Sequence, residues 1–402
     1  PMTMRITEQP GAGLRAMPRG VWALGFVSLF MDISSEMIHG LLPVFLTTVL
    51  GASTEMVGLI EGVGEATASI TKLFSGWISD RLGKRKALTI IGYGLGALSK
   101  PLFAIAPTAS VVLGARFSDR VGKGIRGAPR DAMVGDMVPA GQRGAAFGLR
   151  QALDTVGAFA GPLLAIALMA MLHDNFRLIF WIAIIPGLIS VFVLIFGVRE
   201  PPHQASTAQA PVELKDLKTI GRAYWIVVGV GAVLTLARFS EAFLILRAQN
   251  AGLSLALAPL VLVIMNIVYA LSSYPLGALS DRIDRKAMLA IGFVTLIAAD
   301  MVLAAAPNLI IVMIGVALWG LHMGMTQGLL SALVADEAPQ SLRATAFGVL
   351  NFASGAALLL ASLIAGFLWE QIGPAATFIA GAAFTALGLL ALFLTRGINP
   401  VK

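Results

Sequence analysis

The sequence contains no cysteine among its 402 residues. It therefore has no disulfide framework, no thiolate metal site and no cysteine nucleophile. Charged residues make up only 13% of the chain, whereas hydrophobic residues make up 57%. A chain of this length with so little charge is too apolar for a soluble protein. We therefore predict an all-α polytopic membrane protein whose solvent is the lipid bilayer.

Catalytic signatures are also missing. The sequence has no H-E-x-x-H zinc motif, no G-x-S-x-G nucleophile motif and no G-x-x-x-x-G-K-[ST] phosphate loop, and only four histidines occur. We therefore expect no enzymatic activity, no cofactor and no resident metal. Energy for any transport must then come from an ion gradient, because no large soluble domain is present to hydrolyse ATP.

Twelve apolar stretches of about 20 to 28 residues follow one another, and each can cross a hydrocarbon layer of ~30 Å. If both termini lie in the cytoplasm, 19 of the 29 Lys and Arg residues fall in the tails and inner loops, and only Arg177 and Arg247 lie near outer loops. This bias predicts the orientation. It also explains the net charge of +7 without nucleic acid. We expect a multi-pass protein of the inner (plasma) membrane.

The two halves of the chain repeat each other. GWISDRLGKRKAL at 76–88 returns as GALSDRIDRKAML at 277–289, an offset of about 200 residues. Such a repeat predicts two related bundles with a solute path between them. The expected parts are an N-terminal tail (1–19), a six-helix bundle (20–198), a linker (199–221), a second six-helix bundle (222–396) and a C-terminal tail (397–402).

The repeated loop reads G-x-x-x-D-R-x-G-K-R-x-x-L in its first copy. It resembles the loop between helices 2 and 3 of the major facilitator superfamily. This resemblance implies the fold of that family, with twelve transmembrane helices in two pseudo-symmetric halves. It also implies that the loop controls the conformational change. The residues concerned are Gly76, Asp80, Arg81, Gly83 and Arg85, with Asp281 and Arg282 in the second copy.

A second match lies in the fifth apolar stretch, GLRQALDTVGAFAGPLLA. Its Gly148, Gly157, Gly161 and Pro162 are similar to the antiporter motif of the superfamily, which is found mainly among exporters. Glycines at these spacings let two helices approach closely, and the proline allows a kink. Ordinary packing through small residues is the alternative interpretation.

Ionisable residues inside membrane helices are costly unless paired or hydrated, so they are candidates for function. Asp32, Glu36 and His39 are spaced i, i+4 and i+7 in the first stretch and share one helix face. Asp32 lies roughly 18 Å from the start of that stretch, near the membrane midplane. Burial raises the pKa of a carboxyl group, whereas a nearby Arg lowers it, so a small movement can transfer a proton.

The fourth stretch contributes a run of bases with one acid: Arg116, Asp119, Arg120, Lys123 and Arg126. Arg120, Lys123 and Gly124 resemble the superfamily's helix-4 motif, which implies that Arg120 takes part in proton transfer opposite an acid on helix 1. We predict proton coupling by Asp32, Glu36, Arg120 and Asp154, with Glu61 and Glu65 as weaker candidates. Static buried ion pairs are the alternative.

A predicted substrate cavity includes residues of both halves: Glu36, His39, Arg116, Lys123, Arg238 and Glu241. The C-terminal half has few buried charges, and Arg238 and Glu241, spaced i, i+3, could simply pair with each other. His39 and Glu36 would need further ligands to hold a metal.

We predict a proton-coupled antiporter that exports a small organic solute by alternating access. A proton symporter or uniporter for an organic anion, with the helix-4 bases as ligands, is one alternative. A transporter of metal ions or metal chelates is another. The expected partners are a small-molecule substrate, protons and the lipid bilayer, with no nucleic acid, and we expect a monomer.

Overall fold

The computed structural model describes residues 17–82, 84–139, 143–200, 221–280, 284–337 and 343–394. Three predicted gating residues, Gly83, Asp281 and Arg282, lie outside the described residues. The backbones of Gly76, Asp80 and Arg81 belong to the end of one long helix.

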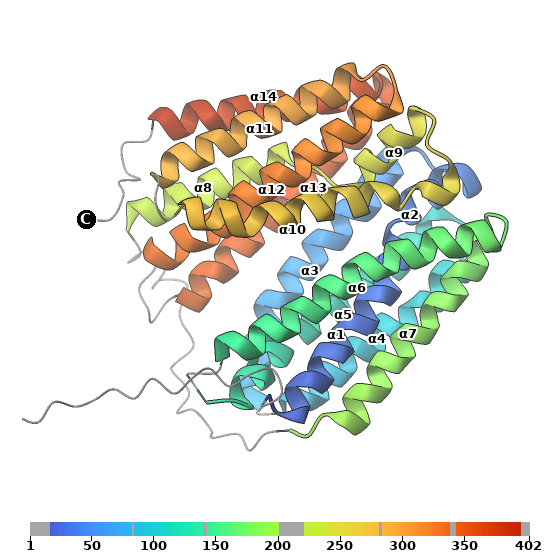
Figure 1. Ribbon diagram of the computed structural model, residues 1–402, viewed down its shortest axis with the longest axis vertical. Coiled ribbons are helices and arrows are strands. Elements are labelled where there is room, and N and C mark those ends of the chain that lie inside the picture. Colours follow the sequence, from blue (N-terminus) through green and yellow to red (C-terminus); the bar gives the residue numbers. More distant parts are fainter. Residues whose placement is uncertain are drawn as a thin grey trace, which may run out of the picture.

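Helices account for almost all of the described chain (Figure 1). The N-terminal half contains α1 (Arg19–His39), α2 (Leu42–Val44) with a π-helical turn (Phe45–Val49), α3 (Thr54–Leu82), α4 (Arg85–Ile105), α5 (Ala109–Asp136), α6 (Arg143–Met171) and α7 (Phe176–Gly197). The C-terminal half contains α8 (Arg222–Ala237), α9 (Ala242–Asn250), a 3-10 turn (Leu255–Leu257), α10 (Leu260–Ser280), α11 (Arg285–Ala305), α12 (Leu309–Glu337), α13 (Arg343–Gln371) and α14 (Pro374–Leu394).

Ten segments of the described chain are long and apolar enough to cross a membrane on length and composition alone. Arg19–Val49 counts as one of them although it contains α1, α2 and the π-helical turn, and Arg222–Asn250 contains α8 and α9. The remaining long helices, α3 and α5, have 29 and 28 residues but carry several charges. α5 is packed against α3 and α4, and α3 also lies against α13 of the other half, so the charges of both helices face neighbouring helices. The predicted fold of twelve membrane helices in two halves is thereby confirmed.

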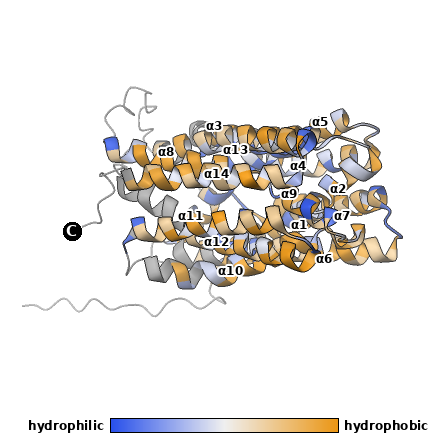
Figure 2. Cartoon of the chain, turned by 90° about the horizontal axis from the view of Figure 1, so that it is seen from above, coloured by the Kyte–Doolittle hydropathy of each residue, from blue (hydrophilic) through white to orange (hydrophobic). Residues whose placement is uncertain are grey.

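The helices of both halves consist largely of apolar residues, which are orange in Figure 2, and many of these side chains are exposed. Leu98, Phe196, Leu271 and Ile310 are each about 70% exposed, at 69%, 71%, 73% and 73%. A large exposed apolar surface is expected where lipid tails replace water.

Two of the crossing segments are interrupted, although the sequence predicted continuous helices. Pro43 has no N–H to donate to the carbonyl of His39, so the first segment breaks between α1 and α2. In the second half, Arg238 leaves the helical region with φ −107° and ψ 79°, and α8 ends. The hydroxyl of Ser240 then accepts a hydrogen bond from the N–H of Ala242 at 3.2 Å, at the start of α9.

The two halves meet along a seam formed by α3 and α13 (Figure 1). Glycines from both helices make the close approach possible. A Cβ at Gly62 would lie 3.1 Å from Leu359 Cα, one at Gly355 would lie 2.7 Å from Ser69 Cβ, and one at Gly366 would lie 2.6 Å from the Thr54 carbonyl oxygen. The seam therefore resembles the small-residue interfaces of membrane helix pairs.

One end of this seam is also held by hydrogen bonds. We call it the distal end, defined by the loops 50–53, 251–254 and 372–373. There Glu370 Oε2 accepts hydrogen bonds from the N–H of Thr54 at 2.9 Å and from its hydroxyl at 2.7 Å. Gln371 Nε2 donates to Glu55 Oε1 at 3.1 Å. The carboxylate of one half thus caps the N-terminus of α3 in the other half.

Candidate functional site: buried charges in the N-terminal half

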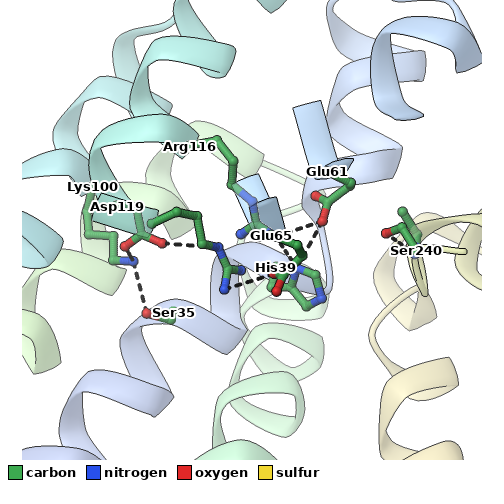
Figure 3. A network of polar contacts seen from close by, with 10 residues as sticks. Ser35, His39, Glu61, Glu65, Lys100, Arg116, Asp119 and Ser240 are labelled. Atoms are coloured by element: carbon green, nitrogen blue, oxygen red, sulfur yellow. Dashed lines mark hydrogen bonds and ion pairs between the residues drawn. The ribbon is translucent and has the colours of Figure 1, made fainter. Parts of the chain in front are cut away.

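Arg116 of α5 lies at the centre of a buried group of polar side chains (Figure 3). Its Nη2 donates to Glu61 Oε2 of α3 at 2.7 Å and lies 3.1 Å from His39 Nδ1 of α1. Arg116 and Glu61 are only 3% and 1% exposed. Three helices are therefore joined by one guanidinium group, and that group compensates the buried carboxylate.

A second group lies beside the first on the same face of α5. Lys100 Nζ of α4 donates to Asp119 Oδ1 at 2.8 Å and to the hydroxyl of Ser35 at 3.0 Å. Arg120 contacts Glu65 Oε1 of α3 at 3.1 Å, and its Nε lies 3.8 Å from Asp119 Oδ2. Figure 3 shows the two groups side by side between the helices.

Local sequence explains why these charges converge. The charges of α5 recur at spacings of three and four residues, which places them on one helical face. Small residues let the neighbouring helices come close to that face. A Cβ at Gly64 would lie 3.1 Å from Arg116 Cγ, and one at Gly122 would lie 2.6 Å from the Gly92 carbonyl oxygen. α5 is therefore packed between α3 and α4, with its charges directed at theirs.

The α1 and α6 helices bring two carboxyl groups together. The side chains of Asp32 and Asp154 lie within electrostatic range of each other. A Cβ at Gly157 would lie 3.0 Å from Asp32 Cβ, and one at Gly161 would lie 2.8 Å from Glu36 Cβ. The glycines of the predicted antiporter motif are thus the residues of α6 that allow the α1 acids to approach. Pro162 lies beside them within α6, whose backbone also includes Gly148.

The predicted opposition of Asp32 and Arg120 is not what the structure shows. In this conformation Arg120 contacts Glu65 and Asp119, and the base that acts on Asp32 is Arg126. The expectation was wrong about the partner because helical spacing alone does not fix which base of α5 faces α1.

Sequence reasoning missed a further group near the other end of α5. The guanidinium of Arg126 lies 4.8 Å from the centre of the Tyr93 ring. Arg130 Nη1 donates to the Tyr93 hydroxyl at 3.2 Å and to the Ser28 hydroxyl at 3.0 Å. In the sequence, Tyr93 was distinguished only by the rarity of tyrosine, which occurs four times in the chain.

Asp154 is also tied to its own helix. Arg150 Nη1 lies 3.5 Å from Asp154 Oδ1, an i, i+4 pair, and Arg150 Nε lies 3.6 Å from Asp131 Oδ1 of α5. Asp154 therefore contacts both a base and an acid.

In the C-terminal half, Arg238 and Glu241 flank the break between α8 and α9 instead of sharing a helix face. No salt bridge joins these two described side chains, although each lies within electrostatic range of the other. Glu241 lies within electrostatic range of Glu36, Glu61 and Glu65 across the interface. Lys123 is likewise within range of Glu36 and Glu65. The residues predicted to line a cavity thus gather around the interface between the halves.

No group of three or more His, Asp or Glu side chains is arranged to hold a metal ion within the part of the chain that the structure describes. His39 instead meets a guanidinium group through Nδ1. In the gating loop, Arg85 at the start of α4 forms an ion pair with Asp136 at the end of α5.

Comparisons with known proteins agree with this architecture. Residues 24–247 and 230–402 match the family model of the Major Facilitator Superfamily. An uncharacterised MFS-type transporter of Methanocaldococcus jannaschii is 33% identical over 387 residues, covering 94% of this chain and 96% of the relative. The Staphylococcus aureus quinolone resistance protein NorA is 26% identical over 119 residues, covering 30% of each chain.

Among solved structures, a POT family transporter in complex with 5-aminolevulinic acid superposes with a TM-score of 0.82. It shares 14% sequence identity and covers 97% of this chain and 99% of its own, which shows the fold. The motifs, the two six-helix halves and the family match over nearly the whole chain lead to one assignment: this chain is a membrane transporter that belongs to the Major Facilitator Superfamily.

Proposed function

We propose that this transporter is a proton-coupled antiporter that exports a small organic solute by alternating access. The observation that carries this proposal is the close approach of Asp32 on α1 and Asp154 on α6, which Gly157 allows. Two ionised carboxylates held close together inside a helix bundle repel each other, so a proton on one of them is favoured. The pair is therefore a site where one proton binds.

The packing around this pair links the proton to movement of the helices. Gly157 and Gly161 hold α6 against the face of α1 that carries Asp32 and Glu36. If α6 moves away from α1, the two carboxyl groups separate, and the repulsion that favours a proton on one of them decreases. Conversely, two ionised carboxylates repel each other and disfavour the closed contact. Protonation and the α1–α6 contact thus depend on each other.

Glu36 connects this proton site to the second half. It lies one turn from Asp32 on α1 and acts electrostatically on Asp32, on Lys123 and on Glu241. Glu36 and Glu241 have no salt-bridge partner among the described residues. A solute with a basic nitrogen, bound between the halves, would be attracted by both acids and would compete with the proton.

The anion-transport alternative has less support in the geometry. Arg116 and Arg120 already contact Glu61 and Glu65 within 3.1 Å. Both bases are therefore largely neutralised, whereas Glu36 forms no salt bridge among the described residues and Glu241 lies only within electrostatic range of Arg238. Export is further supported by the partial similarity to a quinolone resistance protein.

The test is proton release from purified protein in weakly buffered detergent solution when organic amines are added. The variants are Asp32→Asn, Asp154→Asn and Glu36→Gln, with Asp174→Asn in an exposed distal loop as the matched control. We expect amine-dependent proton release in the wild type and in the control. The first two variants should abolish that release.

Amine binding without proton release in the wild type would contradict the antiporter. Proton uptake together with carboxylate binding would instead support the anion symporter. Loss of proton release in Glu36→Gln alone would indicate that the proton binds at Glu36, one turn along α1 from Asp32.

A further inference from the structure

Asp300 of α11 is a buried acid that the proposed proton site does not use. Its side chain is fully buried at 0% exposure, and neither carboxyl oxygen has a hydrogen-bond partner. An ionised carboxylate without a partner is strongly disfavoured in such surroundings. Asp300 lies about five residues from the distal end of α11, in the half of the molecule that has few charges.

Gly381 of α14 provides the space for this carboxyl group. A Cβ at Gly381 would lie 2.6 Å from Asp300 Oδ2 and 3.2 Å from the carbonyl oxygen of Ala237. The carboxyl group and the last carbonyl of α8 therefore face the same small space. Figure 1 shows α8, α11 and α14 packed together at this side of the molecule.

The carbonyl of Ala237 is exposed to this space because α8 ends there. Among the described residues, no backbone N–H donates to it, since the chain leaves the helix at Arg238. The C-terminal end of a helix carries partial negative charge. An ionised Asp300 would be repelled by this end, whereas a protonated carboxyl group could donate to the carbonyl.

The charged groups on the surrounding elements are engaged elsewhere. Arg247 of α9 donates to the carbonyl oxygens of Leu303 and Ala306, at 2.9 and 2.8 Å. His322 of α12 contacts the carbonyl oxygen of Gly292 through Nδ1 at 2.8 Å. Arg238 of the break lies within electrostatic range of Glu241 and Tyr269. Within Pro374–Leu394, α14 has no ionisable residue.

A small pocket adjoins the same place. Leu236 and Phe239 line it from the break in the α8–α9 segment, and Thr377 and Gly381 line it from α14.

We propose that Asp300 is a second proton-binding site: its carboxyl group has no hydrogen-bond partner in this conformation, and when protonated it donates to the free carbonyl end of α8 at the break in the α8–α9 segment. Broken membrane helices are places where helix ends bind coupling ions. The site belongs to the C-terminal half, and its proton is exchanged as the α8–α9 segment rearranges. It is separate from the proton of the Asp32–Asp154 pair.

Infrared spectroscopy of the purified, substrate-free protein tests this proposal directly. The wild type should show C=O absorption of protonated carboxylic acids that contains an Asp300 band, which disappears in Asp300→Asn and persists in Asp32→Asn. Transfer to D2O should shift this band, because a binding site exchanges its proton with solvent. Gly381→Ala, which pushes on the carboxyl group, should change the frequency of the band without removing it.

Three outcomes would overturn the proposal. The spectrum of Asp300→Asn could match that of the wild type, which would show an ionised Asp300. The band could fail to shift in D2O, which would show a permanently locked proton. Sodium chloride, but not choline chloride, could raise the unfolding temperature of a wild type that lacks the band, which would assign a sodium site. Because no solute is present, failure of the antiporter proposal would leave these readings unchanged.

Discussion

At the scale of single residues, Arg116 is the base that pairs with the buried carboxylate of Glu61. It is 3% exposed and compensates Glu61, which is 1% exposed. Such a pair contributes little net stability compared with apolar residues, but removal of one member leaves an isolated charge. The net contribution of the ion pair to stability is therefore measured only when both residues are replaced.

We predict that Arg116→Met destabilises the protein by about 3–5 kcal/mol, because Glu61 loses its counter-charge inside the bundle. The double variant with Glu61→Gln should recover most of this loss. Thermal unfolding followed by tryptophan fluorescence measures both. Equal losses in the single and double variants would show that Arg116 acts through packing alone.

The sequence predicted which ionisable residues lie inside membrane helices, but it did not predict which residues they contact. Asp32, Glu36 and Arg120 were recognised as charges inside membrane helices. The partners of Arg120 depend on the rotation of α5 relative to α3 and α4, which Gly64, Gly92 and Gly122 determine through close contacts. No periodicity in one helix contains that information.

At the scale of helices, the glycines of the predicted antiporter motif allow the close contact between α1 and α6. We predict that Gly157→Ala and Gly161→Ala each cost about 1–3 kcal/mol, because the added Cβ meets α1. Gly127→Ala on α5 is the matched control, since nothing lies within 4 Å of its Cβ position. Alanine there should be neutral or stabilise the helix by up to ~1 kcal/mol.

The measurement is again the midpoint of thermal unfolding, combined with amine-dependent proton release. If both motif variants unfold like the control, the close approach of α1 and α6 is not maintained in the membrane protein. If they are destabilised but release protons normally, the motif serves packing without coupling.

Helix boundaries agree closely with expectation because long apolar stretches and Gly or Pro residues mark them in the sequence. The fifth apolar stretch, which contains GLRQALDTVGAFAGPLLA, lies within α6 (Arg143–Met171). The breaks were not predicted. The break at Arg238 has no proline within it, and it forms where tertiary packing places Asp300 and Gly381 against the end of α8.

At the scale of the whole molecule, Glu370 holds the distal ends of the two halves together. We predict that Glu370→Ala shifts the population toward a distally open state by about fivefold, the equivalent of losing one helix cap worth about 1 kcal/mol. Glu370→Gln retains an acceptor and should shift it less. Spin labels on Thr108→Cys and Ile310→Cys, placed in the cysteine-free chain, report the distance between the halves.

A single unchanged distance distribution in all three proteins would show that the Thr54–Glu370 contact does not hold the halves closed. A larger shift in Glu370→Gln than in Glu370→Ala would contradict the capping explanation.

We further propose that both termini lie in the cytoplasm of a bacterial inner membrane and that the protein is a monomer. In intact cells, a membrane-impermeant maleimide should label Thr108→Cys but not Lys84→Cys, and permeabilised cells should show labelling of both. The reverse pattern would show that the topology is inverted.

Light scattering in detergent measures the mass of the protein and so tests whether it is a monomer.

One property of α3 follows from its two sets of neighbours. It contacts α13 of the other half along one face, and its Glu61 and Glu65 contact the bases of α5. At 1.5 Å per residue, its 29 residues form a rod of ~44 Å. A tilt of about 10° around its middle would move each end by ~4 Å. A tilt of α3 would therefore change its contacts with α13 and with the bases of α5 at the same time, because Glu61 and Glu65 in its first half pair with those bases.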